Sequence, residues 1–225
     1  MKYRGGCLNG ILFFFAMRRK VMDEFKPWPE RIVRQNPCMN TVLCAVLVPI
    51  VRIDGEEHVV FEVRSSKLSW QPGDICFPGG VIEQRDASPL EAALRETQEE
   101  LGVGLPHIRV WGPLDYVESP VGVKIYPFAA QLDTTNFVVS RGEIDHLFTV
   151  PLAWFSGRKP EVAQVELATR PGPGFPAGLP VSGQAGWKKR STYNVLFYYY
   201  KEYKIWGITA QILDNFLGIR AIINA

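Results

Sequence analysis

The stretch that decides the fold runs from Gly79 to Gly102 and reads GGVIEQRDASPLEAALRETQEELG. Its second half predicts a short helix that follows a glycine turn. Ser88, Pro89 and Glu91 form an S-x-x-E capping box with proline at the first helical position. Gly102 is a natural C-terminal stop, since a left-handed residue commonly ends a helix. The stretch therefore predicts one helix with a defined start and a defined end.

A stripe at helical spacing predicts the buried face of this helix. Its members are Leu90, Leu94, Thr97 and Leu101, with Ala93 beside them. Residues that recur every three or four positions lie on one side of a helix. We expect this side to pack against the rest of the domain.

Three glutamates occupy another face of the same helix, namely Glu96, Glu99 and Glu100. Like charges three or four positions apart destabilise a helix by a few tenths of a kcal/mol per pair. These acids also lie near the C-terminal end of the helix, where the macrodipole favours cations. A divalent cation bound by the carboxylates is the simplest relief. A solvated acidic face is the alternative.

The stretch resembles the Nudix box, the signature of hydrolases that cleave a nucleoside diphosphate linked to another group. The residues that match its fixed positions are Gly80, Asp86, Arg95, Glu96, Glu99, Glu100 and Gly102. Two departures stand out. Asp86 occupies a position where the family usually has Glu, and eight residues rather than seven separate Asp86 from Arg95. The core from Arg95 to Gly102 follows the pattern.

The residues before the box resemble the lead-in of the coenzyme A diphosphatase branch of that family. The run VRSSKLSWQPGDICFPGG carries the Arg-Ser, the later glycine and the Phe-Pro-Gly-Gly of the branch, at Arg64, Ser65, Gly73, Phe77, Pro78, Gly79 and Gly80. The extra residue in the box is compatible with the same branch. The tail IWGITAQILDNFL, residues 205–217, is similar to the closing helix of this branch.

The resemblance implies Mg²⁺ or Mn²⁺ as the cofactor, with Glu96, Glu99 and Glu100 as ligands. The segment GEIDHLFTVPLAWF is similar to the one in which a Glu outside the box joins the metal site, which makes Glu143 the candidate. Glu143 or one of the box acids is expected to act as general base on the attacking water. Arg95 is expected to orient the acids by pairing with Asp86 or Glu91.

Several residues are candidates for contact with substrate. Gly79 and Gly80 allow the backbone to bend close to the metal and the phosphates. The candidate cations for the phosphates are Arg64, Lys67 and the cluster Lys188, Lys189 and Arg190. A solvated basic run in a loop is the alternative for that cluster. Candidates to stack an adenine are Trp70, Trp154 and Trp187, with core packing as the alternative, and Glu118 is a candidate to approach the metal.

Strand and helix signals predict an α/β fold. The runs from Thr41 to Val51 and from His58 to Ser65 are rich in β-branched residues and are joined by a turn at Asp54-Gly55. VWGPLDYVES, VKIYPFAAQL and YNVLFYYY supply further strands, whereas residues 167–189 are rich in Gly and Pro and predict a long loop. With the resemblance, these elements predict a single-domain Nudix α/β/α sandwich with a mixed β-sheet.

Composition bounds the organisation of the chain. We expect residues 1–25 to be an N-terminal extension outside the native chain, and residues 26–225 to form the Nudix hydrolase domain. The apolar run GILFFFA is too short to span a bilayer. A net charge of +2 gives no case for non-specific nucleic-acid binding. The four cysteines lack metal-ligand or redox spacing, which favours reduced thiols in a cytoplasmic protein.

Three functions fit these observations. The first is Mg²⁺- or Mn²⁺-dependent hydrolysis of coenzyme A or acyl-CoA to 3′,5′-ADP and 4′-phosphopantetheine or its acyl form. The second is the same pyrophosphatase chemistry on ADP-ribose, NADH or another nucleoside diphosphate derivative, against which the lead-in argues. The third is a catalytically inactive Nudix-fold nucleotide-binding module, against which the intact glutamates argue. The expected partner is a small nucleotide-derived substrate, with no nucleic acid and no membrane, and a homodimer is left open.

Overall fold

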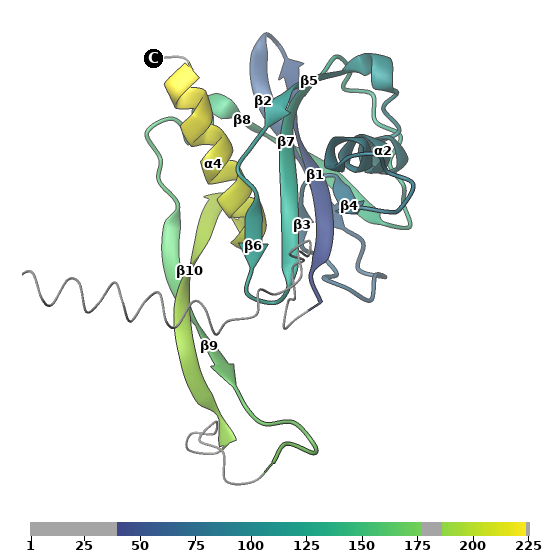
Figure 1. Cartoon of the computed structure of the whole chain (residues 1–225). Coiled ribbons are helices and arrows are strands. Elements are labelled where there is room, and N and C mark those ends of the chain that lie inside the picture. The colour runs from purple at the N-terminus through teal and green to yellow at the C-terminus, as the bar shows by residue number, and fades with distance from the viewer. Residues whose placement is uncertain (1–39, 177–185, 224–225) are drawn as a thin grey trace, which may run out of the picture. The chain divides into compact units, whose positions relative to one another are not determined.

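The computed structural model describes residues 40–176 and 186–223 (Figure 1). The predicted N-terminal extension of residues 1–25 lies outside the described residues. The strands of the larger sheet are β1 (Val42–Ile53), β2 (Glu56–Arg64), β3 (Ile75–Cys76), β4 (Gly79–Val81), β5 (Ile108–Pro113), β6 (Val117–Ser119), β7 (Val123–Leu132) and β8 (Ile144–Pro151). A smaller sheet contains β9 (Glu161–Thr169), β10 (Lys188–Tyr200) and β11 (Tyr203–Trp206). The helices are α2 (Pro89–Leu101), the short α3 (Leu152–Phe155) and α4 (Gly207–Ile223), with a 3₁₀ turn η1 at Leu105–His107.

The larger sheet is built around β1. This strand pairs in parallel with β7, and antiparallel with β2 and β4. The predicted turn at Asp54-Gly55 joins β1 to β2, where Ile53 pairs with Glu56. One parallel pair among antiparallel neighbours makes this a mixed sheet, as the sequence predicts.

Alternate residues of β1 face opposite layers. Leu47 and Val51 pack in one cluster with Leu101 of α2. Val48 and Ile50 pack in another, which holds the buried residues of α4. Successive side chains of a strand point to opposite faces, so both layers are anchored on the same central strand. Figure 1 shows α2 and α4 on opposite sides of the sheet, which confirms the α/β/α sandwich.

The caps of α2 form as the sequence predicts. The Ser88 hydroxyl accepts a hydrogen bond from the backbone N–H of Glu91 at 3.2 Å. The Glu91 carboxylate accepts one from the N–H of Ala87 at 2.7 Å, so it reaches one residue further back than in a standard capping box. At the other end, Gly102 adopts φ 67° and its N–H donates to the Gln98 carbonyl. A Cβ there would lie 2.8 Å from the Val138 carbonyl oxygen. Both the positive φ and this close contact therefore favour glycine at position 102.

The predicted buried stripe of α2 is partly wrong. The buried residues of the helix are Ala92, Ala93, Thr97, Glu100 and Leu101. Leu90 and Leu94 are only half-buried. Since the alanines pack against Ala45 of β1, the helix lies close to the sheet through small side chains. The face toward the sheet is rotated relative to the leucine stripe, and it includes an acid.

Two predictions in the C-terminal part are corrected. Residues 167–169 and 188–189 belong to β9 and β10 and not to a loop, whereas the described residues between them, 170–176 and 186–187, lie outside both strands. Cross-strand pairs such as Lys189 with Ala168 hold this part of the hairpin. The closing helix begins at Gly207 and not at Ile205, because Ile205 and Trp206 pair with β10 as strand β11.

Within the described ranges, no helix has the length and apolar character needed to cross a membrane.

Candidate active site

A glycine turn brings the end of α2 against the sheet. Gly79 in β4 pairs with Val46 of β1 and adopts φ 151°. A Cβ at this position would lie 2.3 Å from the Ala45 carbonyl oxygen, which no side chain can tolerate. The N–H of Gly79 donates to Oε2 of Glu100 at 2.8 Å. The turn predicted to bend toward a metal site therefore binds one of the predicted ligands.

Glu96 packs against the second glycine of the turn. A Cβ at Gly80 would lie 2.5 Å from Oε1 of Glu96. The same oxygen accepts a hydrogen bond from Nη1 of Arg95 at 2.7 Å. Glycine at position 80 therefore makes the space that the Glu96 carboxylate occupies.

Arg95 makes the pair with Asp86 that the sequence predicts. Its Nε lies 3.0 Å from Oδ1 of Asp86 and its Nη2 lies 3.1 Å from Oδ2. This two-point contact lowers the pKa of Asp86, chiefly through the Arg95 hydrogen bonds and next through the N–H of Glu83. Glu91, the other proposed partner, caps Ala87 instead. The extra residue of the box is thus accommodated without losing this pair.

Glu99 differs from the other two box glutamates in exposure. Its side chain is 52% exposed, and it lies 3.3 Å from Nη1 of Arg95 and 3.7 Å from Nη2 of Arg85. Glu100 is buried and Glu96 is half-buried. The predicted set therefore comprises two inward carboxylates and one at the surface.

Glu143 lies beside these inward carboxylates. Its backbone carbonyl accepts from the N–H of Ser65 at 2.8 Å. The N–H of Ser140, three residues earlier, donates to the Glu100 carbonyl at 3.0 Å. The Glu143 carboxylate contributes to the raised pKa values of Glu96 and Glu100. The structure thus brings together the candidates that the sequence places 43 residues apart along the chain.

Sequence reasoning missed a further carboxylate, Glu62 of β2, which is only 1% exposed. No described residue hydrogen-bonds its buried Oε1, and its Oε2 accepts from the Cys76 thiol at 3.8 Å. The signal was available, because Glu62 interrupts the apolar run HVVFEVRS of a strand. An acid at a buried strand position calls for a partner.

The electrostatics of this group favour a cation. Burial raises the pKa of Glu100 to about 8, and repulsion from Glu96 and Glu143 adds to it, while the Gly79 N–H acts in the opposite direction. Burial, followed by the Glu100 charge, raises the pKa of Glu62 well above its usual value. Carboxylate oxygens are the ligands that Mg²⁺ and Mn²⁺ prefer. The donor set, with its partnerless oxygen, fits such a cation.

The carboxylates of the candidate ligands do not point toward one common position. Over the described ranges, no group of three Asp, Glu, His or Cys side chains stands close enough to hold a metal ion. Glu96 is turned toward Arg95, and Glu100 toward Gly79. Binding of one cation by several of these carboxylates would require their side chains to rotate from this arrangement.

A match to a protein-family model shows which family this chain belongs to. The model described as the NUDIX domain matches residues 44–171, more than half of the 225 residues. The chain belongs to the Nudix family. It is a Nudix pyrophosphohydrolase, and its relatives carry the name Nudix hydrolase.

Curated relatives of this Nudix hydrolase differ in how much of their length they share with it. The human protein named mitochondrial coenzyme A diphosphatase NUDT8 is 38% identical over 113 residues, or 48% of either chain. The chain therefore spans about half the length of that relative. The Escherichia coli K12 protein named uncharacterized Nudix hydrolase NudL is 28% identical over 214 residues, covering 95% of this chain and 94% of that one. Among solved structures, a C. elegans Ap4A hydrolase complex is 19% identical with a TM-score of 0.43, covering 50% of this chain and 82% of that chain.

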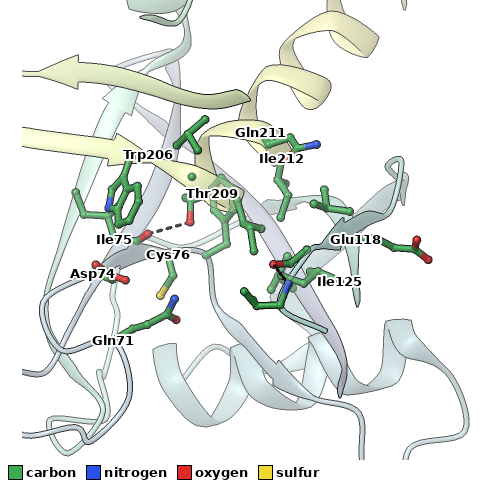
Figure 2. A pocket seen from close by; sticks show the side chains of 18 of the residues that line it. Gln71, Asp74, Ile75, Cys76, Glu118, Ile125, Trp206, Thr209, Gln211 and Ile212 are labelled. Atoms are coloured by element: carbon green, nitrogen blue, oxygen red, sulfur yellow. Dashed lines mark hydrogen bonds between the residues drawn. The ribbon is translucent and has the colours of Figure 1, made fainter. Parts of the chain in front are cut away.

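A cavity of about 580 Å³ in this Nudix hydrolase opens between the sheet, β11 and α4. Arg64 and Cys76 line it from the sheet, and Trp206 and Ile212 line it from the C-terminal elements. In Figure 2 the hydroxyl of Thr209 donates to the Ile75 carbonyl across this cavity, at 2.9 Å. The lining is mostly apolar, and the volume is typical of small-molecule sites.

Arg64 connects the cavity to the carboxylates. It lines the cavity, and its charge also lowers the pKa values of Glu62 and Glu100. Its Nη2 donates to the Trp70 carbonyl at 3.4 Å, while its buried Nε has no hydrogen-bond partner in the described part of the chain. Lys67, the other predicted phosphate contact, is exposed and lies outside the cavity lining. Of the two residues that the sequence predicted to contact phosphate, Arg64 therefore lines the cavity and Lys67 does not.

The remaining substrate candidates lie elsewhere. Trp70 and Trp187 are exposed, Trp154 packs on Phe155 and Tyr200, and none of the three lines the cavity. Trp206, which the sequence did not single out, does line it.

The other charged candidates have protein partners. Glu118 lines the cavity, where Figure 2 places it across from Asp74, but it is paired with Lys124 at 2.9 Å. The basic run at residues 188–190 is strand and not loop. Its Lys189 pairs with Glu166, and its Arg190 donates to the Thr169 hydroxyl.

Proposed function

We propose that this chain hydrolyses the pyrophosphate bond of coenzyme A or acyl-CoA, releasing 3′,5′-ADP and 4′-phosphopantetheine or its acyl form. The observation that carries the proposal is the position of Arg64, which belongs to the lead-in of the branch and borders both the cavity and the carboxylates. A mostly apolar cavity suits the pantetheine arm, and a cation at its edge suits a phosphate. The name of the human relative supports the same substrate class.

The proposed metal ligands are Glu96, Glu99 and Glu100, for Mg²⁺ or Mn²⁺. When bound, such an ion supplies Lewis acidity at the pyrophosphate and lowers the pKa of bound water. The hydrogen bond from Gly79 holds one oxygen of Glu100 and so orients the other. The space beside Gly80 lets the Glu96 carboxylate approach the turn.

The proposed general base is Glu143, with a box acid as the alternative. Its backbone carbonyl accepts a hydrogen bond from the N–H of Ser65, the residue after Arg64, which anchors the backbone of the proposed base next to Arg64. Arg95 is proposed as a positioning residue, since its guanidinium contacts Asp86, Glu96 and Glu99. Arg64 and Lys67 are proposed to bind the phosphates, Arg64 from the cavity wall and Lys67 from the exposed loop that follows it.

The wider assignments are part of the same proposal. We propose residues 26–225 as the hydrolase domain, preceded by an extension of residues 1–25. A cytoplasmic location is supported by the free thiols of Cys44 and Cys76, whereas the human relative is named as mitochondrial. Cell fractionation separates these locations, and light scattering tests whether the chain forms a homodimer.

The test is a side-by-side assay of coenzyme A, ADP-ribose and NADH with Mg²⁺ and with Mn²⁺, with products resolved by chromatography. Release of 3′,5′-ADP from coenzyme A at a rate well above the others supports the proposal. Preference for ADP-ribose or NADH would retain the metal centre and discard the coenzyme A assignment. No turnover by folded, metal-loaded protein would favour a nucleotide-binding module.

A further inference from the structure

Glu62 is a buried acid that the proposed roles leave unused. The residue is 1% exposed within the sheet, and one carboxylate oxygen, Oε1, has no hydrogen-bond partner among the residues that the structure describes. The other oxygen accepts from the Cys76 thiol at 3.8 Å, which is a weak bond. No Lys, Arg or His in the described parts of the chain forms an ion pair with it. A buried carboxylate with this little compensation is costly unless a cation comes to it.

The sheet places Glu62 on the face that carries the proposed metal ligands. Phe61 packs toward α4, whereas Val60 packs in the cluster that contains Leu101 of α2. Because strand residues alternate between faces, Glu62 lies on the α2 side with Val60. This is the side to which Glu100 belongs.

A short stretch of chain also connects the two acids. Cys76 of β3 is the cross-strand partner of Glu62. Three residues later, the N–H of Gly79 binds the Glu100 carboxylate. The charges that face Glu62 are those of Glu100 and Glu143, which raise its pKa, and that of Arg64, which lowers it. Two negative charges against one positive charge leave this buried group short of a cation.

We propose that Glu62 supplies a carboxylate oxygen to the divalent-cation centre beside Glu100, approaching it from the sheet. The proposal rests on the metal centre of the proposed function and adds to it a ligand from outside the box. Glu62 is buried in a strand of the sheet, whereas the Glu99 side chain is exposed at the surface. A neutral acid with a purely structural role is the competing interpretation.

Manganese binding to the full chain, stripped of metal with EDTA, tests the proposal without relying on turnover. The variants are Glu62→Gln, Glu100→Gln and the control Glu56→Gln, whose side chain is exposed near the start of the same strand. We expect Glu62→Gln to weaken Mn²⁺ binding by about tenfold or more, the usual range for supporting groups of a metal site. We expect Glu56→Gln to bind Mn²⁺ like wild type.

Thermal unfolding with and without Mn²⁺ gives an independent readout. Removing an uncompensated buried charge should leave the metal-free Tm of Glu62→Gln equal to or above that of wild type, while the rise in Tm on adding Mn²⁺ shrinks. If Glu62→Gln fails to fold, Glu62→Asp takes its place, because it keeps the charge and withdraws the oxygens by one methylene. Weaker Mn²⁺ binding by that variant supports the proposal, and wild-type binding overturns it.

The outcomes separate the two proposals. Wild-type Mn²⁺ affinity in Glu62→Gln, together with impaired binding in Glu100→Gln, makes Glu62 a structural acid and leaves the proposed function standing. Absence of Mn²⁺ binding by the wild-type chain overturns the proposed metal centre, and the role of Glu62 falls with it.

Discussion

The backbone N–H of Gly79 donates a 2.8 Å hydrogen bond to the carboxylate of Glu100. The two residues belong to different elements, β4 and α2, and this bond fixes the end of the helix against the glycine turn. Glu100 is buried at this point with Glu96 and Glu143 as electrostatic neighbours. Among the described residues, the Gly79 N–H is the one donor that hydrogen-bonds the Glu100 carboxylate, so the geometry of the turn fixes the position of this acid.

Gly79→Ala should destabilise the protein. A Cβ would lie 2.3 Å from the Ala45 carbonyl oxygen, and the φ of 151° disfavours any side chain. A strained backbone of this kind costs about 1–3 kcal/mol, and the collision with main chain adds to it. Thermal denaturation should show a Tm lower by several degrees.

Gly80→Ala is the matched control for that substitution. Its Cβ meets only the end of the Glu96 side chain, which can rotate away. We expect a smaller loss of stability but weaker Mn²⁺ binding, because Glu96 is displaced. Equal losses of Tm in both variants, with unchanged Mn²⁺ affinity, would contradict the assigned geometry of the turn.

Glu99→Gln should lower turnover severely while leaving the fold intact. Glu99 is exposed and its contacts are surface ion pairs with Arg95 and Arg85, which contribute little to stability. As a metal ligand, Glu99 would hold the ion that stabilises the charge developing on the pyrophosphate, and loss of such stabilisation typically lowers kcat by about 10²–10³-fold. Steady-state kinetics at saturating Mg²⁺, with Tm as the folding check, measure both effects.

The control for Glu99→Gln is Glu83→Gln, an exposed acid paired with Arg85. This variant should retain kcat and Tm. Full activity of Glu99→Gln at saturating Mg²⁺ would remove Glu99 from the ligand set and leave Glu96 and Glu100 as its inward members.

Local features of this fold could be predicted from sequence because their partners are close along the chain. Ser88 caps α2, Gly102 ends it, and Arg95 pairs with Asp86 nine residues earlier. The turn at Asp54-Gly55 belongs to the same class. Short-range chemistry of this kind is settled by spacing alone.

Features that depend on distant pairing could not be read in the same way. Composition predicted a loop that included residues 188 and 189, but their pairing with β9 makes them part of a strand. Glu62 was visible as an acid within a strand, yet its face is set only when β3 and α2 pack against β2. Trp206 lines the cavity because it ends strand β11, directly before α4. The sequence pattern of residues 205–217 predicted one continuous helix and therefore did not reveal this strand.

Arg64→Gln should raise KM for coenzyme A by about tenfold or more, since a lost charge-assisted contact to phosphate costs about 1.5–3 kcal/mol. Arg64 lines the cavity, while Lys67 is exposed outside it. Lys67→Gln should therefore raise KM less than Arg64→Gln. Initial-rate kinetics on coenzyme A, with Tm recorded for each variant, make the comparison. A larger effect at Lys67 would place the phosphate contact outside the cavity.

Asp86→Asn should destabilise the protein in a pH-dependent manner. The Arg95 hydrogen bonds lower the pKa of Asp86 in the folded protein below its ordinary value of 3.8. The native state therefore binds fewer protons at this site than the unfolded state as the pH falls, and stability is lost with acid. The contribution is fully present above the unfolded pKa and disappears as the pH drops through the folded one. The Tm of Asp86→Asn should accordingly lie below that of wild type at pH 7, and the gap should close toward pH 2.

Arg95→Lys separates the geometry of this pair from its charge. Lysine keeps the positive charge but cannot make the two-point contact that Nε and Nη2 make with Asp86. We expect a Tm between those of wild type and Asp86→Asn at pH 7, because the charge attraction between the substituted lysine and Asp86 remains while the two-point hydrogen-bonded contact is lost. We also expect lower activity, since Glu96 loses the Nη1 contact that holds its carboxylate. If Arg95→Lys matched wild type in both Tm and kcat, charge alone would account for the pair, and the role of Arg95 in positioning Glu96 would be excluded.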